Sequence, residues 1–161
     1  MKKNVFQSAM FSMLAIAALS FGTFSLTSCG DDDDEKTTDY NLYQQWETTD
    51  VKTVVGSSMA VYFDKLVLDL TQPGTGYLYG RFGEDAPAPD EVIGKYYTIM
   101  ESDYTVNATS KTTGEVTFNN KTQTYTLGKN TLTVSANTGD NVLTANYRLT
   151  SGVKSEGPLP F

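Results

Sequence analysis

The stretch YTLGKNTLTVSANTGDNVLTANYRLTS, residues 125–151, decides the fold class of this chain. Apolar and polar side chains alternate along it, which is the pattern of a half-buried β-strand. The apolar positions of residues 130–136 are Leu132, Val134 and Ala136, and those of residues 141–150 are Leu143, Ala145, Tyr147 and Leu149. Thr-Gly-Asp-Asn at 138–141 has the composition of a turn, so the stretch is predicted to form a hairpin.

The same period of two extends outward from this hairpin. Further strands are predicted at 46–55, 59–70, 76–82, 95–109, 114–118 and 123–127, and the strand at 95–109 is expected to bend near 101–103. Within 59–70 the apolar positions change from odd to even between Phe63 and Leu66, so a bulge is predicted at Asp64-Lys65. No segment combines a helical period with a cap. About eight or nine short strands indicate an all-β, antiparallel barrel or sandwich.

Three motifs add a resemblance to this pattern. The chain contains LYQQW at 42–46, LVLDLTQPGTGYLYG at 66–80 and the hairpin quoted above. In this order they resemble the small lipocalin-like domains of secreted bacterial lipoproteins. The resemblance implies a barrel of about eight strands with Trp46 on the first strand and a turn at Pro73–Gly76. An immunoglobulin-like sandwich is the alternative.

The N-terminus is predicted to be an export signal. Lys2 and Lys3 precede an apolar stretch without charge up to Asp31. Leu26-Thr27-Ser28-Cys29 resembles the lipobox of bacterial lipoproteins, which implies lipid on Cys29 and loss of residues 1–28. An uncleaved membrane anchor is the alternative. A lone cysteine in an exported chain fits lipidation, because it has no internal disulfide partner.

An acidic run follows the cysteine directly. Asp31, Asp32, Asp33, Asp34 and Glu35 resemble the surface-export signal of lipoproteins in Gram-negative gut and oral anaerobes. The alternative is a solvated spacer. The expected organisation is therefore a signal peptide at 1–28, a lipidated cysteine and tether at 29–40, and one β domain at 41–161. The expected location is the outer membrane, lipid-anchored, at the cell surface.

The residue composition bounds the possible chemistry. The net charge of −7 argues against a nucleic-acid partner, which requires clustered Lys and Arg. Histidine is absent, and no nucleophile, zinc or phosphate-loop motif occurs. Carboxylates at Asp64 and Asp69, or in GEDAPAPDE at 83–91, are interpreted as solvated surface groups. We therefore nominate no catalytic residue, no cofactor and no metal site, and we expect a protein that is not an enzyme.

A binding role is the better hypothesis. Tyr77, Tyr79 and Arg81 share one face of a predicted strand, and residues of these types are common at binding surfaces. Trp46, Tyr62 and Tyr97 complete the set of candidate ligand-binding residues, although β-sheets are rich in aromatics in any case. The expected function is binding of a small apolar or amphipathic ligand in the barrel. The alternatives are a surface module that binds a glycan or protein, and a purely structural lipoprotein.

Overall fold

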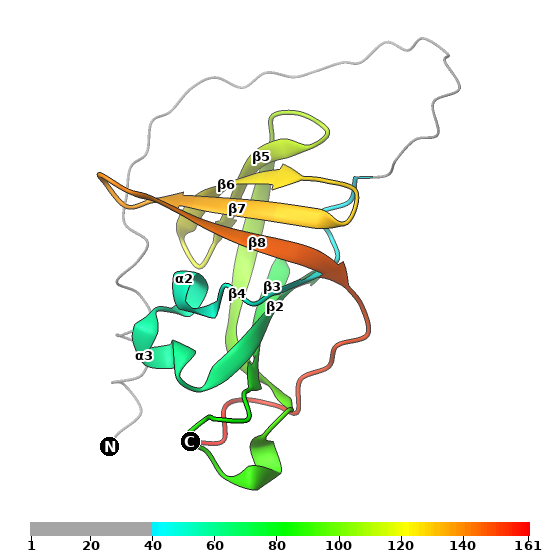
Figure 1. The fold of residues 1–161 in the computed structure, drawn as a ribbon. Helices are drawn as coiled ribbons and strands as arrows, with labels where there is room; N and C mark the ends of the chain where they lie inside the picture. The colour runs from blue at the N-terminus through cyan, green and yellow to red at the C-terminus, as the bar shows by residue number, and fades with distance from the viewer. Residues whose placement is uncertain (1–39) are drawn as a thin grey trace.

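The computed structural model describes residues 40–161 and shows a closed barrel of eight antiparallel strands (Figure 1). The strands follow one another in chain order, and β1 closes the barrel by pairing with β8. Their bounds are β1 Gln45–Thr48, β2 Phe63–Gln72, β3 Thr75–Phe82, β4 Tyr96–Ala108, β5 Thr113–Phe118, β6 Lys121–Leu127, β7 Thr131–Asn137 and β8 Val142–Thr150. The prediction of an all-β, lipocalin-like barrel is confirmed, and the sandwich alternative is wrong. Cys29 and the acidic run lie outside the described residues.

The predicted strand at 46–55 is wrong beyond Thr48, where a short helical connection begins. This connection holds α2 (Val51–Val55) and α3 (Ser57–Ala60), and a single 3-10 turn, η1, lies at Asp90–Val92. The carbonyl of Asp50 accepts the N–H groups of Thr53 at 3.0 Å and Val54 at 3.2 Å. Valine favours strands, but this preference is weak, and burial of Val51 and Val55 across the end of the barrel overrides it.

Two irregularities set which side chains enter the barrel. The register of β2 against β3 shifts between Phe63 and Lys65, which confirms the predicted bulge. The predicted bend in β4 is displaced to Ile99, where the register against β3 skips a residue. Because of this bulge, Tyr97, Ile99 and Met100 all pack against the same apolar cluster.

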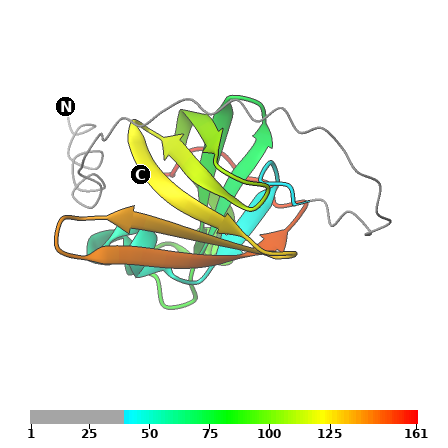
Figure 2. The ribbon, with the colours of Figure 1, turned by 90° about the horizontal axis from the view of Figure 1, so that it is seen from above.

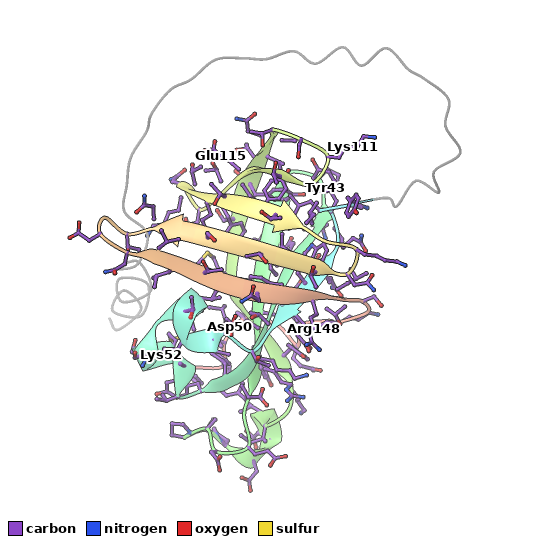
Figure 3. The ribbon with its side chains drawn as sticks, turned by 45° about the horizontal axis from the view of Figure 1, so that its top comes forward. Tyr43, Asp50, Lys52, Lys111, Glu115 and Arg148 are labelled. Carbon is purple, nitrogen blue, oxygen red and sulfur yellow. The ribbon has the colours of Figure 1, made fainter. Side chains whose placement is uncertain are left out.

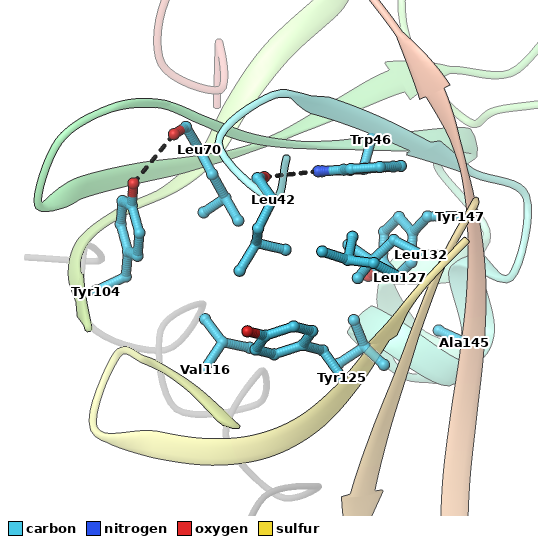
Figure 4. Close-up of a cluster of buried hydrophobic side chains, with 11 residues drawn as sticks. Leu42, Trp46, Leu70, Tyr104, Val116, Tyr125, Leu127, Leu132, Ala145 and Tyr147 are labelled. Carbon is cyan, nitrogen blue, oxygen red and sulfur yellow. Dashed lines mark hydrogen bonds between the residues drawn. The ribbon is translucent and has the colours of Figure 1, made fainter. Parts of the chain in front are cut away.

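The interior of the barrel is filled by two apolar clusters. The N-terminal cluster includes Leu42, Trp46 and Leu70 and extends across the barrel to Ala145 and Tyr147 on β8 (Figure 4). The helical cluster lies beneath α2 and α3 and includes Leu66 and Phe82. Trp46 is only 1% exposed and Phe82 is fully buried, so side chains occupy the axis of the barrel. The barrel closes on itself within residues 45–150, and Leu42 and Leu159 complete its core, so we expect residues 40–161 to fold without residues 1–39.

Two glycines of β3 make this packing possible. A Cβ on Gly80 would lie 2.6 Å from Ile99 Cδ1 and 2.7 Å from Phe63 Cδ1. A Cβ on Gly76 would lie 2.7 Å from Phe118 Cε2. Both glycines therefore leave room for larger side chains that reach across the interior.

The C-terminal segment, residues 151–161, crosses from the end of β8 to the start of β4 (Figure 1). The Gln45 amide holds it by two hydrogen bonds, Nε2 to the Val153 carbonyl at 2.8 Å and Oε1 from the Val153 N–H at 2.9 Å. The Thr98 N–H donates to the Gly157 carbonyl at 2.7 Å, and a parallel bridge joins Thr98 to Pro158. The segment thus pairs with the part of β4 that β5 does not reach.

Candidate functional site

A cavity of about 360 Å³ opens at the end of the barrel where the described chain begins. Four elements form it: the loop before β1, the end of β2, the turn between β2 and β3, and β4. Its lining residues are Tyr43, Leu70, Thr71, Pro73, Gly74, Tyr104 and Val106. The volume falls in the range of small-molecule sites and holds about a dozen waters at about 30 Å³ each. We call this the tyrosine cavity.

Local hydrogen bonds place Tyr43 at the rim of this cavity. The Asn41 side chain accepts the N–H of Tyr43 at 2.9 Å, and the Asn41 carbonyl accepts Gln44 Nε2 at 3.0 Å. Trp46 Nε1 donates to the Leu42 carbonyl at 2.9 Å, which ties the loop to the core. The Tyr43 ring remains 53% exposed (Figure 3). An exposed aromatic on a fixed loop is available to a ligand.

Tyr104 forms the inner wall of the cavity and is fixed on both sides. Its hydroxyl donates to the Leu70 carbonyl at 3.0 Å (Figure 4) and shares the same hydrogen with the Gln72 carbonyl at 3.2 Å. Its N–H donates to the Gly74 carbonyl at 3.0 Å, where Gly74 has a φ of 79°. Pro73 followed by Gly74 suits a type II turn, which confirms the turn predicted at this place. The ring centroid of Tyr104 lies 6.4 Å from that of Tyr43.

The lining of the tyrosine cavity is mostly apolar and carries no charged side chain. Burial raises the pKa of the Tyr104 hydroxyl, and the nearby Tyr43 raises it further. Burial and Tyr43 raise the pKa of Tyr125 in the same way. Tyr125 is 5% exposed, and its hydroxyl makes no hydrogen bond within residues 40–161. The neighbourhood therefore offers neutral hydroxyls between apolar walls.

The six candidate ligand-binding residues from the sequence do not line this cavity. Trp46 lies in the N-terminal cluster, and Tyr97 points inward, with its ring 5.6 Å from Phe82 and edge-on to it. Tyr62 lies at the helical end, with its ring 5.7 Å from that of Phe161. The other three residues lie together on the outer face of β3, as the alternation predicted.

Most side chains on that outer face of β3 are bonded to or stacked on other side chains of the barrel. Tyr79 stacks on Tyr77 at 6.0 Å and donates its hydroxyl to Asp69 Oδ2 at 3.2 Å. Arg81 Nε donates to Asp64 Oδ1 at 2.9 Å. The bulge thus brings Asp64 onto the same outer face as Asp69, but each carboxylate is engaged by its own donors. Only Tyr77 of the three keeps a half-exposed ring without a hydrogen bond among the described residues.

Asp69 is the most enclosed carboxylate of this face, at 7% exposure. Burial alone raises the pKa of Asp69, but hydrogen bonds from Thr71, Gln45 and Tyr79 together outweigh it and hold the pKa below the usual value. Gln45 Nε2 lies 2.8 Å from Oδ2, and Thr71 Oγ1 lies 2.6 Å from Oδ1. This network joins β1, β2 and β3 and serves the fold.

Sequence reasoning missed Tyr43 and Tyr104. Tyr104 and Val106 alternate on one face of β4, but the direction of that face depends on the bulge at Ile99. Tyr43 lies within the quoted motif LYQQW, where only the tryptophan was singled out. The alternation in β4 was a usable signal, whereas the loop position of Tyr43 follows from tertiary packing.

Within residues 40–161 no helix is long and apolar enough to cross a membrane. In the same part of the chain no three His, Cys, Asp or Glu side chains gather to hold a metal ion. No family model matches the chain, and no match was found among curated proteins or solved structures.

Proposed function

We propose that the protein is a lipoprotein, held in the outer membrane by lipid on Cys29 and exposed at the cell surface, whose barrel binds a small apolar or amphipathic ligand. The tyrosine cavity is the observation that carries the binding part of this proposal. Its ligand binds at the end of the barrel, because the buried Trp46 and its cluster fill the interior beyond the cavity.

The chemistry of the cavity favours an uncharged ligand. Leu70, Pro73 and Val106 provide apolar walls, while Thr71 and the tyrosine hydroxyls provide hydrogen-bonding groups. An ionised ligand would find no opposite charge in this lining and would lose hydration. A molecule with an apolar body and a neutral polar group fits these walls.

The anchor and the cavity are close in the sequence. Tyr40, the first described residue, precedes the rim residue Tyr43 by three positions. Tyr40 follows Cys29 by eleven positions, and a chain of that length spans at most about 40 Å. A lipid on Cys29 would thus keep the cavity within about 40–50 Å of the bilayer. This proximity supports a ligand of amphipathic character.

Native mass spectrometry of residues 30–161, compared with the same sample denatured, tests the binding proposal. We expect extra mass that disappears on denaturation. Tyr43→Ala should lower the ligand-bound fraction, while Tyr77→Ala, which changes a half-exposed tyrosine outside the cavity, should leave it unchanged. Equal loss in both variants would place the ligand elsewhere, and bare mass in every preparation would remove the proposal.

The anchor has its own test. Cys29→Ala in the full chain should release the protein from the membrane fraction, because a chain without acyl groups loses stable attachment. Replacing Asp31–Glu35 with Ser and Gly should leave the lipid in place but reduce protease accessibility of the barrel on intact cells. Membrane retention of the Cys29→Ala variant would contradict the lipoprotein assignment without affecting the cavity.

A further inference from the structure

A second cleft lies at the opposite, helical end of the barrel, between α2 and the sheet β6–β8. It encloses about 40 Å³, enough for one to three waters. Its lining residues are Thr53, Val54, Gln123, Val134, Ala136, Leu143, Ala145 and Tyr147. β7 and β8 extend past α2 as a long hairpin (Figures 1 and 2). Small side chains of this hairpin leave the space that α2 covers.

Tyr147 brings an unpartnered hydroxyl to this cleft. The residue is only 5% exposed, yet its hydroxyl makes no hydrogen bond within the described part of the chain. In that same part, no fully enclosed side-chain nitrogen or oxygen lacks a partner. The Tyr147 oxygen must therefore reach open space, and the cleft that Tyr147 lines provides it. By contrast, the Tyr104 hydroxyl bonds two carbonyls.

The charge next to this hydroxyl limits what the cleft can bind. Asp50 Oδ2 accepts the N–H of Asn146 at 2.8 Å, just where β1 ends beside β8 (Figure 3). Burial raises the pKa of Tyr147, and the negative charge of Asp50 raises it further. The hydroxyl thus stays neutral, and an anionic ligand in contact with it would be repelled by Asp50.

α2 is a short helix that covers this cleft. It has five residues, fewer than an isolated helix needs to be stable, so its docking on the barrel holds it in place. Val51 and Val55 are buried, whereas Thr53 and Val54 are half-buried and form the outer wall of the cleft. Gly56, at φ 80°, follows the helix directly; its N–H donates to the Lys52 carbonyl and its carbonyl accepts the Ala60 N–H, both at 3.0 Å. Movement of α2 away from β8 widens the cleft.

We propose that this cleft is a second binding site, which takes a small neutral molecule with an apolar body and one hydroxyl, ether or carbonyl oxygen. The oxygen bonds the Tyr147 hydroxyl, and the apolar body rests against Val54, Val134 and Ala145. The site is independent of the tyrosine cavity, which lies at the other end of the barrel.

The test uses benzyl alcohol as the neutral probe and benzoate as its anionic match, added to ¹⁵N-labelled residues 30–161. Benzyl alcohol is larger than the closed cleft, so binding requires α2 to move. With benzyl alcohol we expect saturable changes in the amide chemical shifts of α2 and of Val134, Ala136, Ala145 and Tyr147. Benzoate should bind at least fivefold more weakly. Shifts confined to the tyrosine cavity, or equal affinity for the two probes, would overturn the proposal.

Two variants sharpen the test. Tyr147→Phe should weaken the binding of benzyl alcohol about five- to tenfold, as expected for one lost hydrogen bond. Tyr125→Phe removes the other buried, unpartnered hydroxyl and should leave binding unchanged. Ala136→Leu fills the cleft and should abolish binding while the amide spectrum keeps the dispersion of the folded barrel. Unchanged binding in Tyr147→Phe or in Ala136→Leu contradicts the site.

Discussion

Replacing Asp69 by alanine tests whether the buried network across β1, β2 and β3 holds the barrel. Asp69 accepts Gln45 Nε2 and the Tyr79 hydroxyl through Oδ2, and Thr71 N and Oγ1 through Oδ1. Thr71 is exposed, so water can replace its acceptor. Gln45 and Tyr79 are buried, and each keeps a donor without an acceptor in the variant.

The magnitude follows from these two donors. A buried donor left unpaired costs about 1–3 kcal/mol, so two give about 2–6 kcal/mol. Water entering the space of the lost carboxylate reduces this cost, and we expect a loss of about 3 kcal/mol in the free energy of unfolding. For a domain of this size that corresponds to a fall in Tm of roughly 10–15 °C.

The matched control is Asp64→Ala, which removes a carboxylate from the same strand and the same face. Asp64 is exposed and paired with Arg81, so its loss should cost below about 1 kcal/mol. Urea unfolding followed by Trp46 fluorescence measures both variants. Equal losses would show that the Asp69 network does not stabilise the fold as described.

The dependence of stability on pH below neutral gives a second test of the same network. The pKa of Asp69 is lowered in the folded state, so the folded state binds fewer protons than the unfolded state near pH 4. Its contribution is present above the unfolded pKa of about 4 and disappears as the pH falls through the folded value. Wild type should lose stability in this window more steeply than Asp69→Ala, and parallel pH curves would contradict the lowered pKa.

Three further predictions concern other parts of the barrel. Gly80→Ala should lower the free energy of unfolding by about 1–3 kcal/mol, because the new Cβ meets only side-chain atoms of Ile99 and Phe63. Gly114→Ala should lower it more, because its Cβ would lie 2.5 Å from the backbone oxygen of Asn107. Chemical unfolding of the two variants measures the difference. Deleting residues 155–161 should speed hydrogen exchange of the Thr98 amide, which loses the Gly157 carbonyl, and leave the amides of β7 unchanged. Burial and neighbouring carboxylates raise the pKa of Tyr79 and of Tyr96 to about 12. These hydroxyls should therefore ionise near pH 12, which absorbance at about 295 nm measures. The stability that they contribute should decline above about pH 10, which unfolding curves measure.

The sequence predicts the barrel well where one face of a strand is apolar and the other is not. In β7, Leu132 and Val134 alternate with threonines, so both the strand and its inward face could be predicted. The odd-to-even change between Phe63 and Leu66 likewise located the bulge in β2. Periodicity works here because a shift of one residue would turn the apolar set to solvent.

The same reasoning fails where contacts distant in sequence decide the structure. Val51, Val54 and Val55 favour a strand locally, yet they form a helix because it covers the end of the barrel. β2 buries residues of both faces, since the outer face at Val67 and Asp69 is also covered. The sequence favours Tyr79 and Arg81 as binding residues, but their polar groups are hydrogen-bonded to carboxylates on β2.

The positions of the two cavities follow from where large side chains stop along the barrel axis. An eight-stranded barrel is just wide enough to be filled by side chains or to hold one small ligand. Here Trp46 is buried in the cluster that reaches both cavities, so a ligand must bind beyond that cluster at either end. At the end with the tyrosine cavity, the packed interior ends at Leu70 and Tyr104. At the end covered by α2, it ends at Val134 and Ala145. Enlarging Ala145 would therefore close the cleft under α2 and leave the tyrosine cavity open, because the filled layers between them separate the two sites.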